Sequence, residues 1–220
     1  MRETTNMYFI DDFKRRLLLF FCCIVIFLQA NAQDAEGNRM NLQGYSGGMM
    51  FHTGYLSGGC LNMPDNQGKI NIEGMPAGIG GLLRLHLGKH LRIGGEGYTS
   101  TLSYGKNESF MTLAWGGLLI DSPWKINKYT AFFGGTIGGG SIKNITVLHT
   151  PPSHSIEKSA VYRNYSVMTA VPFMGMEYAL TRRIHLITKV DYIVNIAQKQ
   201  SDFAMGPRVY AGIIFFHTTK

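Results

Sequence analysis

Residues 184–195 read Ile-His-Leu-Ile-Thr-Lys-Val-Asp-Tyr-Ile-Val-Asn, and apolar and polar side chains alternate along most of this stretch. Neighbouring side chains of a β-strand point to opposite faces, so alternate positions share a face. One face would carry Ile184, Leu186, Thr188, Val190, Tyr192 and Val194, and the other His185, Ile187, Lys189, Asp191, Ile193 and Asn195. The first face suits lipid and the second suits a polar interior. The stretch therefore predicts a strand in the wall of a membrane barrel.

The chain beyond residue 32 has the same all-β character. All 27 glycines lie there, and glycine costs about 1 kcal/mol per residue in a helix interior. They occur among Tyr, Phe, Ile, Val and Thr, which favour strands. No stretch reaches the ~18 consecutive apolar residues of a transmembrane helix. Segments of period two, bounded by turn residues, predict eight strands at 42–57, 76–88, 91–104, 109–121, 129–144, 163–179, 184–195 and 206–217.

The length and spacing of these strands indicate their architecture. Most exceed the five or six residues typical of soluble proteins, and tilted strands of membrane barrels need about 9–11 residues in the hydrocarbon alone. The connections are short at 88–90, 122–128 and 180–183 and longer at 58–75, 145–162 and 196–205, with 105–108 as a short exception. Bacterial barrels place tight turns in the periplasm and longer loops outside. The sequence therefore predicts a single up-and-down antiparallel transmembrane β-barrel, whose largest outer loop is 145–162.

Charged residues occur on one face of the predicted strands. The predicted interior set is Arg84, His86, Arg92, Glu96, Glu177, Lys189, Asp191 and Arg208. The interior of an eight-stranded barrel is just wide enough to be filled by side chains, and buried charges must be paired. We therefore expect an internal salt-bridge network and no catalytic, cofactor or metal site. A sharper alternative is that His86, Glu96 and Ser100 form a catalytic set.

Aromatic and glycine residues fit the same architecture. Trp124, Tyr129 and Tyr178 are predicted interface aromatics, because tryptophan and tyrosine favour the level of the lipid headgroups. Trp115 lies in mid-strand, as either a lipid-facing residue or an internal plug. Glycine pairs recur inside the strands, where they mark bends or make room for large neighbours. The run 138–140 is no phosphate loop, because no helix follows it.

The first 32 residues have the pattern of a secretory signal peptide. Lys14, Arg15 and Arg16 precede an apolar run at 17–28 that is too short to span a bilayer, and Ala30-Asn31-Ala32 follows it. This pattern predicts cleavage after Ala32, giving a signal peptide at 1–32 and a barrel domain at 33–220. An uncleaved anchor and a start at Met7 are the alternatives. The remaining chain has Cys60 as its one cysteine, so it has no internal disulfide.

With these residues placed, the chain resembles the small outer-membrane β-barrel proteins common in Bacteroidota. The resemblance rests on Gln33 directly after the Ala-x-Ala site, on the glycine-aromatic strands and on the closing stretch 206–217. It implies an outer-membrane location and recognition of the last strand by the barrel-assembly machinery. One departure is that residues 217–220 follow Phe216, where many such proteins end on the aromatic residue. The resemblance transfers no functional residue.

Three functions compete at this stage. The preferred one is a non-enzymatic, filled barrel that acts in envelope integrity or surface interaction through its outer loops. The second is a barrel enzyme acting on lipid A or phospholipid, and the third is a periplasmic lipocalin-like binder of apolar ligands, with an apolar interior and a polar exterior. The basic residues of the mature chain are scattered, so the expected partners are outer-membrane lipid and lipopolysaccharide rather than nucleic acid. We expect a monomer without cofactors.

Overall fold

The computed structural model describes residues 42–62, 69–105, 109–148, 159–196 and 200–218. The chain divides into two compact units, Met1–Asn41 and Leu42–Lys220, and all described residues belong to the second. The predicted signal peptide at 1–32 lies outside the described residues. Among the described residues, no helix is long and apolar enough to cross a membrane.

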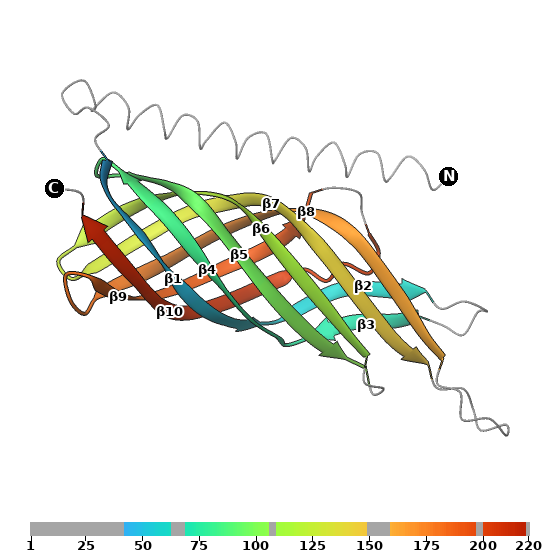
Figure 1. Cartoon of the computed structure of the whole chain (residues 1–220). Coiled ribbons are helices and arrows are strands. Elements are labelled where there is room, and N and C mark those ends of the chain that lie inside the picture. The colour runs from blue at the N-terminus through green and yellow to red at the C-terminus, as the bar shows by residue number, and fades with distance from the viewer. Residues whose placement is uncertain (1–41, 63–68, 106–108, 149–158, 197–199, 219–220) are drawn as a thin grey trace, which may run out of the picture. The chain divides into compact units, whose positions relative to one another are not determined.

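Eight strands close into one antiparallel barrel, which confirms the predicted fold class (Figure 1). They are β1 (Leu42–Gly54), β4 (Pro76–Leu87), β5 (Leu91–Tyr104), β6 (Ser109–Ile126), β7 (Tyr129–Leu148), β8 (Ser159–Ala179), β9 (Ile184–Asn195) and β10 (Gly206–Thr218). Each pairs with its neighbours in sequence, and β1 closes the barrel by pairing with both β4 and β10. Every strand range predicted from the sequence overlaps one of these strands.

The two ends of the barrel differ in their connections. At one end, here called the turn end, tight turns join β4 to β5 at 88–90, β6 to β7 at 127–128, and β8 to β9 at 180–183. Gly88 and Asn127 take the left-handed conformation at two of these turns, with φ of 66° and 57°, and glycine and asparagine tolerate that conformation best. In the third turn, the Thr181 hydroxyl accepts hydrogen bonds from the backbone N–H groups of Arg183 and Ile184. The opposite end is called the loop end.

The loop end contains a hairpin where the sequence predicts only a loop at 58–75. Strand β2 (Leu56–Asn62) pairs with β3 (Lys69–Gly74) in a separate two-stranded sheet. Ser57 and Met205 exchange backbone hydrogen bonds, and the N–H of Cys60 donates to the carbonyl of Ser201. These bonds attach the hairpin to the segment before β10. The sequence prediction was wrong here because Gly58 and Gly59 interrupt the alternation that continues through Ile70 and Ile72.

The predicted boundaries also differ at several strand ends. The first strand ends at Gly54 rather than at residue 57, whereas β6 continues to Ile126, β7 to Leu148, and β8 begins at Ser159. Residues 122–126 belong to β6 although Pro123 lies among them. Its missing N–H does not interrupt a ladder with β5, because that ladder ends at the Arg92–Asp121 pair. Proline is tolerated at such an unpaired strand edge.

The barrel wall separates two kinds of surface. On β9, Lys189 and Asp191 are 1% and 3% exposed, whereas Val190 between them is 46% exposed. The same alternation places large apolar side chains on the outside, among them Met49, Phe51, Leu83, Leu118, Met174 and Phe215. Inward-facing glycines make room for large interior rings, because a Cβ atom at Gly78 or Gly80 would overlap the ring of His52 or Tyr98. The core is therefore inside the barrel, and the outer face of the described strands carries exposed apolar side chains.

Candidate functional site

Four charged side chains form a connected set of ion pairs inside the barrel near the turn end, here called the turn-end quartet. Arg84 lies 3.1 Å from Asp121 (Nη1 to Oδ2) and 2.6 Å from Glu177 (Nη2 to Oε1). Arg92 lies 2.5 Å from Asp121 (Nε to Oδ1) and 2.8 Å from Glu177 (Nη1 to Oε1). Each arginine thus contacts both carboxylates, and the quartet joins β4, β5, β6 and β8. Its formal charges sum to zero.

The turn-end quartet also packs against an aromatic ring. The guanidinium carbons of Arg84 and Arg92 lie 5.4 and 5.0 Å from the ring centroid of Phe132. A cation within about 6 Å of a ring centroid is attracted by the negative face of the ring. Phe132 therefore gives both guanidinium groups a favourable contact in addition to the carboxylates, which reduces the cost of burying them.

A second group, here called the central quartet, lies further from the turn end and contains Glu96, Lys189, Asp191 and Arg208. Lys189 Nζ lies 2.7 Å from Glu96 Oε2 and 3.8 Å from Asp191 Oδ2. Arg208 donates two hydrogen bonds of 2.9 Å to the two carboxylate oxygens of Asp191. This two-point arrangement is the strong geometry for an arginine–carboxylate pair. The formal charges of this quartet also sum to zero.

Neutral side chains complete the contacts of the central quartet. Glu96 accepts hydrogen bonds from the Thr136 hydroxyl at 2.6 Å and the Tyr98 hydroxyl at 3.2 Å. Lys189 Nζ lies 4.4 Å from the ring centroid of Tyr210, and Arg208 lies 5.1 Å from that of Trp115. Trp115 is therefore an internal residue, which decides between the two placements that its mid-strand position leaves open.

Seven of the eight residues of the predicted interior set lie in the two quartets: Arg84, Arg92, Glu96, Glu177, Lys189, Asp191 and Arg208. The eighth, His86, lies two residues beyond Arg84 on the same face of β4 but outside the quartet, with Nε2 2.8 Å from the Ser46 hydroxyl and its ring edge-on to that of Phe216. Sequence reasoning missed Asp121, which pairs with both arginines of the turn-end quartet. The signal was its inward position in the period-two pattern, but the strand was predicted to end at that residue.

The residues of the alternative catalytic set are not brought together. His86 pairs with Arg92 across the β4–β5 ladder, and Ser100 lies eight positions further along β5. At a rise of about 3.3 Å per residue, the two backbones are roughly 26 Å apart. Glu96 is occupied by Lys189, Thr136 and Tyr98. Among the described residues, no group of three or more His, Cys, Asp and Glu side chains could hold a metal ion.

The predicted interface aromatics lie on the outer face near the turn end. Trp124 stacks on Phe133 with ring centroids 4.5 Å apart, and Tyr129 lies 5.1 Å from Tyr178. Trp124 and Tyr129 are 37% and 48% exposed. The four rings come from three adjacent strands, β6, β7 and β8, and these two ring pairs are here called the aromatic belt.

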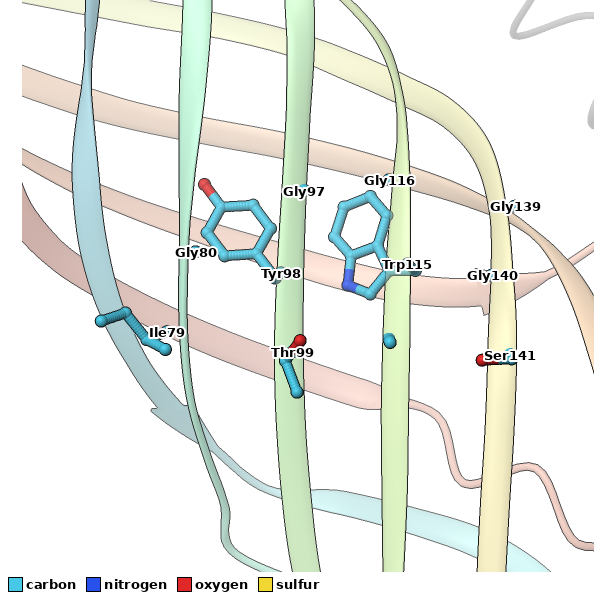
Figure 2. Close-up of a pocket in the computed structure, with 11 residues that line it drawn as sticks. Ile79, Gly80, Gly97, Tyr98, Thr99, Trp115, Gly116, Gly139, Gly140 and Ser141 are labelled. Atoms are coloured by element: carbon cyan, nitrogen blue, oxygen red, sulfur yellow. The ribbon is translucent and has the colours of Figure 1, made fainter. Parts of the chain in front are cut away.

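A shallow depression lies on the wall formed by β4 to β7 (Figure 2). Gly97 pairs with Gly116, and Gly116 pairs with Gly139, so three successive strands lack a side chain at the same point of the ladder. Ile79 and Thr99 lie beside this glycine row. The depression results from the missing side chains.

The comparisons with known proteins concern architecture. No protein-family model matches the sequence, and no curated protein is similar to it. The attachment invasion locus protein Ail of Yersinia pestis, solved with the heparin analogue sucrose octasulfate, has 11% identity over 80% of this chain and 100% of that one, with a TM-score of 0.49. Neisserial surface protein A has 12% identity over 78% and 96% of the two chains, with a TM-score of 0.49. The N-terminal β-barrel domain of Pseudomonas aeruginosa OprF has 10% identity over 80% and 100%, with a TM-score of 0.39.

Proposed function

We propose that the protein is a non-enzymatic outer-membrane β-barrel that acts in envelope integrity or surface interaction through its outer loops. In this proposal the chain is exported, cleaved after Ala32 and folded by the barrel-assembly machinery. The turn end faces the periplasm and the loop end faces outward, as in bacterial barrels generally. The barrel is a monomer whose partners are outer-membrane lipid and lipopolysaccharide.

The observation that carries the proposal is the distribution of charge and apolar surface across the barrel wall. Arg84, Lys189 and Arg208 are at most 1% exposed, whereas Phe51 is 68% exposed and Leu118 is 81% exposed. A monomeric soluble protein rarely exposes apolar patches larger than a few hundred Å². Lipid removes this conflict, because it provides an apolar solvent for the outer face. The same distribution argues against a lipocalin-like binder, whose interior would be apolar and whose exterior would be polar.

The filled interior supports a structural role rather than a channel. The largest fully buried side chains include Arg84, Arg92, Arg208, Tyr210 and Lys189. The charges of the two quartets contact one another from opposite parts of the wall, for example β5 to β9 through Glu96 and Lys189. An ion that entered would have to break such pairs, so we expect no steady conductance.

The experiment has two steps, which test the location and the filled interior separately. Protein in isolated membranes should resist carbonate extraction and should migrate faster on a gel when unheated, and the mature chain should begin at Gln33 by mass. Purified protein in a planar bilayer should give no steady conductance, with a large porin as the positive control. Extraction by carbonate without a heat-dependent shift would contradict the membrane barrel. Steady conductance would contradict the filled interior.

The enzyme alternative has its own test in the same preparation. A lipid-modifying barrel would convert phospholipid or lipid A in the vesicles that hold it. We expect no change in the mass of either lipid after prolonged incubation. Conversion that is lost in a Ser100→Ala variant with unchanged heat-modifiability would overturn the non-enzymatic assignment.

A further inference from the structure

Basic residues gather at the turn end of the barrel. Its three tight turns and the adjoining strand ends carry Lys89, Lys125, Lys128, Arg182 and Arg183, here called the basic rim. All five side chains are exposed. The turns at 88–90, 127–128 and 180–183 contain neither Asp nor Glu. Within the part of the chain that the structure describes, none of the five forms an ion pair.

Four of these cations lie in one continuous part of the rim. The turn of Lys128 contacts the end of β8, because the N–H of Ala179 donates to the carbonyl of Lys128 at 2.9 Å. The turn of Arg182 and Arg183 follows β8 directly, and the N–H of Phe216 on β10 donates to the carbonyl of Arg183 at 2.8 Å. These backbone hydrogen bonds fix each turn to the neighbouring strand, so the four charged residues lie on adjacent parts of the barrel wall.

The aromatic belt indicates the depth in the membrane at which these four cations lie. Trp124 precedes Lys125 on β6, Tyr129 follows Lys128 at the start of β7, and Tyr178 lies at the end of β8 just before the third turn. Aromatic belts mark the level at which the hydrocarbon meets the headgroups. The rim cations come next along the chain toward the turn end, which places them at the level of the lipid phosphates.

We propose that the basic rim binds the headgroups of anionic phospholipids in the membrane leaflet on the turn side. This inference rests on the proposed function, since it needs the barrel to span a membrane. Each Lys or Arg near an anionic surface contributes attraction, and the rim offers several at one depth with no carboxylate in the turns to offset them. The loop end differs, because its described charges are mixed: Lys69, Glu73, Lys143, Arg163 and Asp202. Arg163 there is 3.5 Å from Asp202 and is already paired.

The test measures lipid selectivity at the barrel surface. Full-length mature protein is reconstituted in phosphatidylcholine vesicles that contain spin-labelled phosphatidylglycerol or spin-labelled phosphatidylcholine. Motionally restricted label then reports association with the barrel. We expect phosphatidylglycerol to associate about threefold more strongly than phosphatidylcholine at low salt, and we expect the preference to fall toward one in 0.5 M NaCl, because salt screens exposed charges.

Matched variants show which basic residues cause the preference for phosphatidylglycerol. Lys125→Gln combined with Lys128→Gln should lower the preference by at least about half, and so should Arg182→Gln combined with Arg183→Gln. Lys69→Gln combined with Lys143→Gln removes the same charge from the loop end and should leave it unchanged. An equal loss in this loop-end variant would overturn the proposal, as would a wild-type preference near one in protein that is inserted and heat-modifiable. If the protein bound purified peptidoglycan and showed no preference for phosphatidylglycerol, the proposal would also be overturned. Wild-type protein that fails to insert contradicts the membrane barrel instead.

Discussion

The two halves of the barrel interior are buried to the same degree but are held by different forces. The half from the turn end to the middle of the barrel contains the two charged quartets, with Arg84 and Arg208 both fully buried. The half toward the loop end also holds a buried polar group, in which the Tyr104 hydroxyl contacts Asn144 and Thr146, but most of its side chains are apolar and come from the wall and from the β2–β3 hairpin. They are Leu56, Ile72, Leu102, Met111, Leu113, Ile142, Val167 and Ile193. One sheet therefore carries two kinds of core on its inner face. The outer face carries exposed large apolar side chains along both halves, together with hydroxyl side chains such as Thr101.

This difference shows that burial alone does not decide which side chains fill a small barrel. Damaged apolar packing loses the transfer free energy of the removed atoms and leaves a cavity that neighbouring groups fill only in part. A buried ion pair behaves differently, because removal of one partner leaves a charge without compensation. The quartets should therefore tolerate single changes somewhat less well than the apolar half.

The largest effect is expected from breaking the central quartet at Lys189. Lys189→Met removes the cation between Glu96 and Asp191, and the barrel would then hold an uncompensated negative charge. We expect the free energy of unfolding to fall by about 3–5 kcal/mol. Urea titration of protein in vesicles, followed by loss of the heat-dependent gel shift, measures this change.

A second substitution in the same quartet separates charge from packing. Glu96→Gln added to Lys189→Met restores neutrality while keeping a side chain of similar size, and Asp191 and Arg208 stay paired with each other. We expect the double variant to recover at least about half of the lost free energy, because contacting residues are coupled. If the double variant were less stable than Lys189→Met alone, the electrostatic account of this half would be wrong.

A smaller effect is expected in the apolar half. Leu113 is 2% exposed on β6, and Leu113→Ala should lower the free energy of unfolding by about 2–4 kcal/mol through lost burial and a residual cavity. Leu113→Met, which nearly conserves volume, should cost less than about 1.5 kcal/mol in the same titration. Equal losses in the two variants would mean that this half does not depend on close packing.

The sequence predicted the two faces well and the internal pairing poorly, for a physical reason. Alternation is local, so the inward positions of Lys189 and Asp191 follow from their own strand. The partner of each charge depends on how far neighbouring strands shift past one another, and nothing in one strand specifies that shift. The contact of His86 with Ser46 on β1 could not be predicted from β4 alone for this reason. Asp121 was missed because its strand was predicted to end at that residue. The hairpin at 56–74 was missed because glycines hide its alternation.

The smallest effect on the free energy of unfolding is expected from a substitution on the outer face of the barrel, which belongs to neither half of the interior. The hydroxyls of Thr101 and Thr112 lie 3.5 Å apart on the outside of β5 and β6, and this pair is exposed. Thr101→Val keeps the shape and removes the hydroxyl, so we expect a change within about 0.5 kcal/mol. The same urea titration checks it. Thr188→Val, which removes a hydroxyl that donates to the carbonyl of Met176 at 3.4 Å on the outside of β9, should give an equally small change. A loss of unfolding free energy as large as that of Leu113→Ala would show that contacts on the outer face also stabilise the fold. The two halves of the interior would then not account for the stability of the barrel by themselves.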